Sequence, residues 1–214
     1  MNYLARKKYF SILFSVMVVA ILWESLQRSA IADEAALYDN APEGSAFIRV
    51  ISLMDTPLSL TIGDKQLHSE DYCRASEFVY LPAGQYQQYL NGRLWQANLK
   101  PKAIYSLVVS SSDTWLIQEP EVNSTRKGML AVYNFTSYQS LSIRTRKGGM
   151  AVFKQLPQGE NIFRSVNPIK IDLAAFTNDE HLLDTPSVIF QAGVLSSLFL
   201  CEREESLESH WAMN

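Results

Sequence analysis

The sequence predicts an all-β fold, with two tandem β-sandwich domains following a cleaved signal peptide. Short runs alternate apolar with polar residues, and Gly, Pro and Asn interrupt these runs at close intervals. Helical periodicity is absent over any useful length. The stretch 46–62 also returns about eighty residues later, at 128–143. A repeat at this spacing indicates that one structural unit occurs twice.

The repeat is visible in three pairs of segments that occur in the same order. The pairs are AFIRVISLMDTPLSLTI with GMLAVYNFTSYQSLSI, FVYLPAG (78–84) with FKQLPQG (153–159), and IYSLVV (104–109) with LSSLFL (195–200). In the first pair Phe47 falls on Met129 and Leu58 falls on Leu141. We therefore expect both domains to share one strand order.

The first residues form an export signal. Three basic residues at 6–8 precede an uncharged apolar run over 9–23, and Ala30-Ile31-Ala32 has the small residues that a signal peptidase requires. The run is shorter than the roughly 20 residues that span a bilayer, which favours cleavage over a retained anchor. We predict a signal peptide at 1–32 and an exported protein, which in a bacterium is periplasmic.

The charge of the mature chain excludes several classes of partner. Without residues 1–32 the chain has 182 residues, 15 of them basic and 21 acidic, so its net charge is −6. An acidic protein without a basic stripe is a poor ligand for nucleic acid or for an anionic membrane surface. The same charge repels a polyuronate at long range.

Turn residues divide the mature chain. The predicted parts are an N-terminal sandwich over 33–118 that begins with a polar arm at 33–44, a linker at 119–125, a C-terminal sandwich over 126–203 and an acidic tail at 204–214. Gly63-Asp64 and Asn91-Gly92 predict two-residue β-hairpins, the second of which places Tyr89 opposite Leu94 and Gln88 opposite Trp95.

In the C-terminal half, VNPIKIDLAAF (166–176) alternates Ile169, Ile171 and Leu173 with polar residues, which predicts one strand with a buried face. The chain is rich in glutamate from Glu202 onward, and we expect the tail to fray or to form a short helix.

The two cysteines, Cys73 and Cys201, lie in different repeat units of the exported part. Oxidation is possible there, and a disulfide would close 128 residues of chain and stabilise the fold by roughly 4 to 5 kcal/mol. Two buried thiols that pack as small hydrophobes are the equally weighted alternative.

Residues for chemistry are few. The three histidines show no metal-binding spacing, so we expect neither a metal site nor a cofactor. Asp179 and His181 are the candidate catalytic residues, because an acid can orient an imidazole that deprotonates a serine. No GxSxG turn supplies that serine, and FTNDEHLL reads more simply as a polar hairpin loop.

Aromatic and arginine side chains are stronger candidates for binding. The aromatic residues could stack on sugar rings or dock a partner, although strand alternation buries about half of such residues. They are Tyr38, Tyr86, Tyr89, Trp95, Tyr105 and Trp115. Arginines on strands could contact acidic groups, and the set is Arg49, Arg93, Arg144 and Arg146.

Three stretches together resemble the alginate O-acetylation protein AlgF family. They are ALYDNAPEGSAFIRV (36–50), FVYLPAGQY (78–86) and NPIKIDLAAF (167–176), and in this order they cover nearly all of the mature chain. The cysteine pair and the acidic tail are not features associated with that family. The resemblance implies a periplasmic, non-catalytic adaptor that works with a membrane O-acyltransferase and periplasmic SGNH-type acetyltransferases on an exopolysaccharide, either alginate or cellulose.

Three functions follow for testing: an adaptor of polysaccharide O-acetylation, a carbohydrate-binding module that presents the polymer, and an acetyltransferase. A pilus chaperone would share the two-sandwich layout but would need a basic cleft, which the sequence does not indicate. The candidate residues for binding a partner or glycan are Tyr38, Pro42, Gly44, Ser45, Arg49, Tyr86, Tyr89, Trp95, Asn167 and Pro168.

Overall fold

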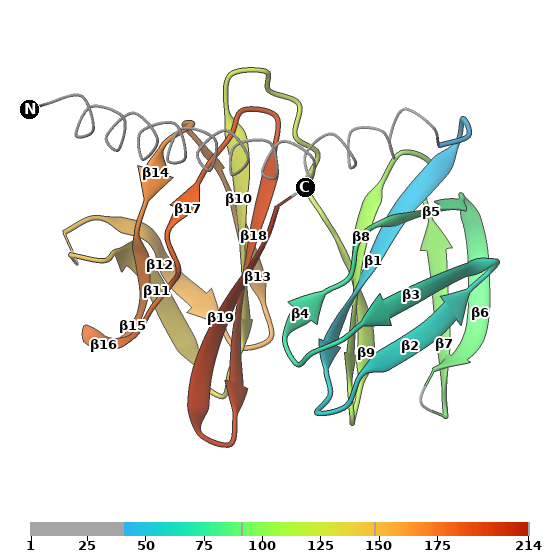
Figure 1. Cartoon of the computed structure of the whole chain (residues 1–214), viewed down its shortest axis with the longest axis horizontal. Coiled ribbons are helices and arrows are strands. Elements are labelled where there is room, and N and C mark those ends of the chain that lie inside the picture. Colours follow the sequence, from blue (N-terminus) through green and yellow to red (C-terminus); the bar gives the residue numbers. More distant parts are fainter. Residues whose placement is uncertain (1–40, 91, 148, 214) are drawn as a thin grey trace, which may run out of the picture. The chain divides into compact units, whose positions relative to one another are not determined.

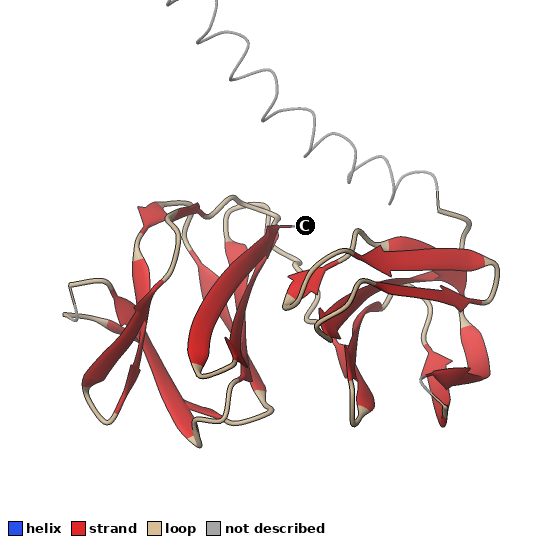
Figure 2. Ribbon diagram, turned by 60° about the horizontal axis from the view of Figure 1, so that its bottom comes forward, coloured by secondary structure: helices blue, strands red, loops and turns tan. Residues whose placement is uncertain are grey.

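The computed structural model describes residues 41–90, 92–147 and 149–213. Every regular element in these residues is a β-strand, and none is a helix (Figures 1 and 2), so the all-β prediction is confirmed. Within this part of the chain there is accordingly no helix that could span a membrane. The predicted signal peptide and most of the predicted arm lie outside the described residues.

The main sheet of the first domain is built around β1, which has neighbours on both edges (Figure 1). Its strands are β1 (Ser45–Leu53), β4 (Arg74–Ala75), β5 (Val79–Pro82), β8 (Ile104–Ser110) and β9 (Thr114–Gln118). Their order is β4-β1-β8-β9, and β5 also pairs with β1. The first eight residues of β1 are buried, because both faces of this strand are covered.

Two hairpins cover one face of that sheet. They are β2 (Leu58–Ile62) with β3 (Lys65–Ser69), and β6 (Gly84–Leu90) with β7 (Arg93–Leu99). Tyr89 lies opposite Leu94 and Gln88 lies opposite Trp95, which confirms the predicted register. Apolar side chains from both hairpins, from the even-numbered positions of β1 and from β5 and β8 form the first core, which includes Ile48, Leu60, Leu67, Leu81 and Leu107.

The second domain contains two four-stranded sheets and a short two-stranded ribbon. One sheet has the order β13-β10-β18-β19, with β10 (Gly128–Phe135), β13 (Asn161–Val166), β18 (Leu195–Arg203) and β19 (Ser206–Met213). The other has the order β12-β11-β15-β16, with β11 (Ser140–Thr145), β12 (Ala151–Pro157), β15 (Leu173–Thr177) and β16 (Glu180–Asp184). The ribbon pairs β14 (Lys170–Ile171) with β17 (Val188–Ile189).

The sequence repeat reappears in the strand pairing. β1 pairs in parallel with β8, and Phe47 lies opposite Ile104. β10 pairs in parallel with β18, and Met129 lies opposite Leu195. In the sequence repeat, Met129 aligns with Phe47 and Leu195 aligns with Ile104. The two domains therefore share the central pairing of their main sheets, residue for residue.

One of the three matched segments does not follow this equivalence. The strand that contains FVYLP, β5, pairs with β1, whereas the strand that contains FKQLP, β12, pairs with β11. The partner of β10 in the place of β5 is β13. Both Leu-Pro-x-Gly segments end a strand at the proline and continue to a glycine at positive φ, but Gly84 (φ 148°) begins β6 whereas Gly159 (φ 74°) lies in a turn. The two segments therefore share a strand end and not a place in the sheet.

Two predicted boundaries in the C-terminal half are wrong. The stretch 166–176 is not one strand: β13 ends at Val166, and two separate strands follow Pro168, which lacks the N–H that a sheet interior needs. The tail is also not a frayed end or a helix, because β19 pairs with β18 over its whole length. Its residues Glu204 and Glu205 both have positive φ and form the tight turn between these strands.

A third apolar cluster joins the two domains. It contains Ile51 and Val108 of the first domain together with Tyr133, Leu195 and Phe199 of the second. Ile51 is an odd-numbered residue of β1, so the face of β1 opposite the first core points to the second domain. We call this cluster the interdomain core; it makes 42–213 one connected unit.

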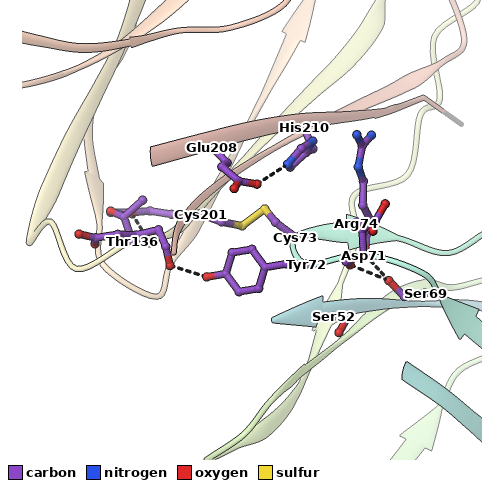
Figure 3. Close-up of a disulfide and its surroundings, with 12 residues drawn as sticks. Ser52, Ser69, Asp71, Tyr72, Cys73, Arg74, Thr136, Cys201, Glu208 and His210 are labelled. Atoms are coloured by element: carbon purple, nitrogen blue, oxygen red, sulfur yellow. Dashed lines mark hydrogen bonds and ion pairs between the residues drawn. A yellow bond between two sulfur atoms is a disulfide. The ribbon is translucent and has the colours of Figure 1, made fainter. Parts of the chain in front are cut away.

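A disulfide between Cys73 and Cys201 closes the edge of the interdomain core (Figure 3). Their Cα atoms are 6.1 Å apart, and both cysteines are fully buried. The neighbouring Tyr72 donates a hydrogen bond from its hydroxyl to the carbonyl oxygen of Glu202. Of the two alternatives that the sequence left open, the structure contains the disulfide and not two separate thiols.

Candidate functional site

The β6–β7 hairpin carries three of the proposed aromatic binding residues, and the strand pleat separates them. Tyr89 is 74% exposed on the outer face beside Leu94, which is 48% exposed. Trp95 is only 6% exposed and packs in the first core. The assignment of Trp95 to a docking surface is therefore wrong, because this position of the pleat faces inward.

Tyr86 is partly buried and packs against the first core. Its hydroxyl donates a hydrogen bond to the carbonyl oxygen of Pro82, 2.8 Å away. Burial raises the pKa of Tyr86, and the negative charge of Asp64 adds to the shift. Tyr89 is accordingly the freely presented aromatic side chain of the three.

A groove of about 370 Å³ lies beside Tyr89, between β2 and β6. Four consecutive residues of β2, three of β6 and one of β8 line it; the full set is Leu58, Ser59, Leu60, Thr61, Gln88, Tyr89, Leu90 and Val109. Consecutive residues of a strand line a groove only when the strand edge faces it. None of the eight lining residues is charged.

In the second domain the strand that matches β2 is paired at this place. There β11 pairs directly with β15, so that Ser142 lies opposite Phe176. In the first domain β2 and β6 are not paired, and the side-chain Nε2 of Gln88 donates instead to the carbonyl oxygen of Thr61, 2.9 Å away. The groove is thus a difference between two domains that otherwise share their central pairing.

The arm before β1 was the predicted docking segment. Tyr38 lies outside the described residues. Pro42 is exposed, while the backbone N–H and the hydroxyl of Ser45 both donate to the carbonyl oxygen of Pro42, at 3.1 and 2.7 Å. Gly44 supplies the positive φ of this turn, +82°. Ser45 is buried and serves the turn, so its assignment to a binding surface is wrong.

Arg49 is also not a surface residue, contrary to the prediction. It is fully buried, and its Nη2 lies 3.2 Å from Oε1 of Glu119 and 2.8 Å from the hydroxyl of Ser197. Its Nε donates to the hydroxyl of Ser106, 2.8 Å away. The physical reason is its place on β1: odd-numbered residues of this strand face the second domain.

Glu119 completes this buried network. Its carboxylate also accepts hydrogen bonds from the hydroxyls of Ser106 and Tyr133, so residues of both domains meet on one acid. Glu119 directly follows β9, within the predicted linker, and its side chain is buried in the domain junction. Burial raises the pKa of Tyr133 well above its ordinary value, and the charge of Glu119 raises it further. The phenol therefore stays protonated as a donor.

Asp179 and His181 bind different partners. Asp179 forms an ion pair with Arg144, while Nε2 of His181 lies 2.9 Å from Oδ1 of Asp184. Asn178 and Asp179 both have positive φ and form the two-residue turn between β15 and β16. The segment is the polar hairpin that the sequence favoured, and residues 178–181 are exposed.

Asn167 and Pro168 are exposed in the connection between β13 and β14. The following Ile169 is 56% exposed, as is Ile189 in the partner strand of the ribbon. These residues lie on the second domain, whereas Tyr89 and the groove lie on the first. The structure therefore does not gather the candidates into one site, and the described residues contain no cluster of three metal-ligating side chains.

The buried network of Arg49 was not predicted from the sequence; its other members are Ser106, Glu119, Tyr133 and Ser197. Small hydroxyl residues inside the apolar runs IYSLVV and LSSLFL were the available signal, because a hydroxyl in a buried strand requires a partner. The repeat aligns these two runs, so their serines meet at the junction of the two domains.

The profile of the family described as "Alginate O-acetyl transferase AlgF" matches residues 21–196. The chain belongs to the AlgF family. It is 29% identical over 188 residues to the alginate biosynthesis protein AlgF of Pseudomonas putida, covering 87% of each chain. It is 31% identical over 183 residues to AlgF of Azotobacter vinelandii, covering 84% of this chain and 83% of that one.

A solved structure of the C-terminal domain of AlgF from Pseudomonas aeruginosa is 24% identical, with a TM-score of 0.38, and covers 42% of this chain and 99% of that one. The resemblance to AlgF inferred from the three sequence stretches is thus confirmed by the family match.

Proposed function

We propose that this protein is a periplasmic, non-catalytic accessory protein required for the O-acetylation of an exopolysaccharide, with alginate as the first candidate polymer. The names of the family and of its relatives support alginate acetylation as the process. In this proposal the protein works as an adaptor between a membrane O-acyltransferase and periplasmic SGNH-type acetyltransferases.

The family name contains the word transferase, so the non-catalytic role needs its own support. It rests on one observation: among the described residues, no histidine is hydrogen-bonded to a serine. His181 and His210 are bound to the carboxylates of Asp184 and Glu208. Acyl transfer through a serine needs a base within hydrogen-bond reach of the hydroxyl.

Two features support an adaptor. The two domains are held in a fixed orientation by the interdomain core, the buried Arg49–Glu119 pair and the disulfide. A fixed orientation suits a protein that presents separate surfaces to its partners. The exposed candidates also lie on different domains, with Tyr89 on the first and Pro168 on the second. Two separated surfaces could engage two partners at once.

The test is polymer acetylation in cells that lack the gene. We expect polymer without acetyl groups, and full recovery with either the parent chain or His181→Ala. A catalytic base would lose orders of magnitude in rate on removal. Loss of acetylation in a His181→Ala variant that melts normally would instead support an acetyltransferase.

A carbohydrate-binding module is the second candidate, favoured by the exposed Tyr89 beside a groove with hydroxyl and amide groups. Its lining has no cation for a polyuronate, so only a neutral glycan would fit. Calorimetry with trimannuronate and with cellotriose tests this candidate. Binding of cellotriose at micromolar Kd would favour it over the adaptor.

Tyr38 offers a test of docking by the arm. If Tyr38→Ala leaves the melting temperature unchanged and abolishes co-purification with a periplasmic acetyltransferase, the arm docks the partner. A lowered melting temperature would instead show that Tyr38 covers the first domain. If neither changes, attention moves to Tyr89.

A further inference from the structure

The groove between β2 and β6 exposes a free strand edge, and the β2–β3 turn identifies its free backbone groups. Gly63, with φ +60°, and Asp64 form a two-residue turn between Ile62 and Lys65. In such a hairpin the pair flanking the turn is hydrogen-bonded, and every second pair after it is too. The N–H and C=O groups of Ser59 and Thr61 therefore point away from β3, into the groove.

The contact of Gln88 agrees with this direction. Its Nε2 donates to the carbonyl oxygen of Thr61 at 2.9 Å, the place where the N–H of a neighbouring strand would otherwise donate. An amide side chain thus substitutes for a backbone amide at one position of the edge. No other backbone or side-chain hydrogen bond from β6 to β2 is found in the described residues.

The second domain shows what closes an edge of this kind. The repeat aligns Ser59 with Ser142, and Ser142 of β11 lies opposite Phe176 of the antiparallel strand β15. In the first domain the groove occupies that position. An extended chain laid along β2 would restore the pairing that β15 provides to β11.

The size and lining of the groove specify the occupant. Four residues of β2 line it, which corresponds to about 13 Å of strand and a partner segment of three or four residues. Inward side chains of that segment would meet Val109, Leu60 and Leu90, and outward ones would lie near Ser59 and Tyr89. The absence of charge in the lining matches an uncharged peptide and does not match a polyuronate.

We propose that the free edge of β2 binds a short, extended, uncharged peptide segment of a partner protein by strand addition. In this mode main-chain hydrogen bonds give affinity, and alternate side-chain pockets give specificity. This binding mode would be one way in which the proposed adaptor contacts a partner. It rests on the proposed function only for the identity of that partner.

The test uses the purified exported protein and an acetylated, amidated peptide with the sequence LAAFT, which copies β15 (Leu173–Thr177). Titration is followed by the backbone amide signals in a ¹⁵N correlation spectrum, which detects weak binding in the parent protein without any substitution. We expect the amides of Ser59, Thr61 and Tyr89 to shift most.

A matched pair of variants separates backbone from side-chain recognition. Ser59→Ala keeps the N–H that faces the groove, so its Kd for the peptide should stay within about twofold of the parent's. Both variants lose the Ser59 hydroxyl, which accepts a hydrogen bond from Nε2 of Gln66, 3.1 Å away. Ser59→Pro also loses the N–H, and since residue 59 makes no backbone bond to β3, it should bind the peptide about tenfold more weakly than Ser59→Ala, the effect of one lost hydrogen bond. The melting temperatures of both variants are compared with that of the parent.

Three results would overturn the proposal: no shift of these amides with the peptide, equal binding by the Ala and Pro variants, or shifts with cellotriose or trimannuronate in place of the peptide. The last result would assign the groove to a glycan. Polymer acetylation in cells is measured separately, so failure of the adaptor function would not change the outcome of the peptide titration.

Discussion

The buried pair of Arg49 and Glu119 can be tested by a double-mutant cycle. Both side chains are fully buried, and Nη2 of Arg49 lies 3.2 Å from Oε1 of Glu119. Removal of one member of such a pair leaves an uncompensated buried charge and costs about 3 to 5 kcal/mol. We expect Arg49→Met and Glu119→Leu each to lower the free energy of unfolding by this amount.

The double variant Arg49→Met/Glu119→Leu should lose far less unfolding free energy than the two single variants lose in sum. The double variant has no unpaired buried charge. The hydroxyls that lose a charged hydrogen-bond partner still cost about 1 kcal/mol each; they are those of Ser106, Tyr133 and Ser197. A total loss of about 3 kcal/mol, against a sum of 6 to 10, gives a coupling energy of at least about 3 kcal/mol.

The assay is urea unfolding of the four proteins, followed by tryptophan fluorescence. The ion pair of Arg203 with Asp55 is the matched control, because it also joins the two domains but is exposed to solvent. Its cycle with Arg203→Met and Asp55→Leu should give a coupling energy of at most about 1 kcal/mol. Additivity of the Arg49 and Glu119 variants within about 0.5 kcal/mol would refute the reasoning.

Three further predictions concern the junction and the tail. Replacing both Cys73 and Cys201 by Ala should lower stability by up to about 5 kcal/mol, since the bridge spans 128 residues; a change under about 1 kcal/mol in urea unfolding would contradict this. Truncation after Arg203 removes β19 and should unfold the second domain, seen as lost strand signal in circular dichroism; a tail that only frays would leave the spectrum unchanged. The pKa of Tyr133 is raised in the folded state above the ordinary value of 10.0. The protonated phenol therefore contributes its full share of the unfolding free energy below pH 10, and this contribution is lost as the pH rises further. Tyr133→Phe should reduce this alkaline loss, measured as unfolding free energy between pH 9 and 11, and an unchanged pH profile would count against it.

Sequence alone determined the features that depend on local chemistry and on the repeat. Two-residue turns with Gly at Gly63 and Gly92 set the hairpins and the register of Tyr89 opposite Leu94, because turn length fixes which residues face each other. The repeat aligned Phe47 with Met129, and both strands proved to occupy the same place in their sheets. Three short stretches were also enough to indicate the AlgF family.

Only the tertiary structure decided which face of each strand meets solvent. Alternation marks two faces of β1, but it does not say that a second domain covers the one that carries Arg49. The disulfide between Cys73 and Cys201 likewise forms because two positions 128 residues apart in the chain meet at that junction. The acidic tail became a strand because β18 had a free edge to pair with, and a free edge is a property of the assembled sheet rather than of the residues that fill it.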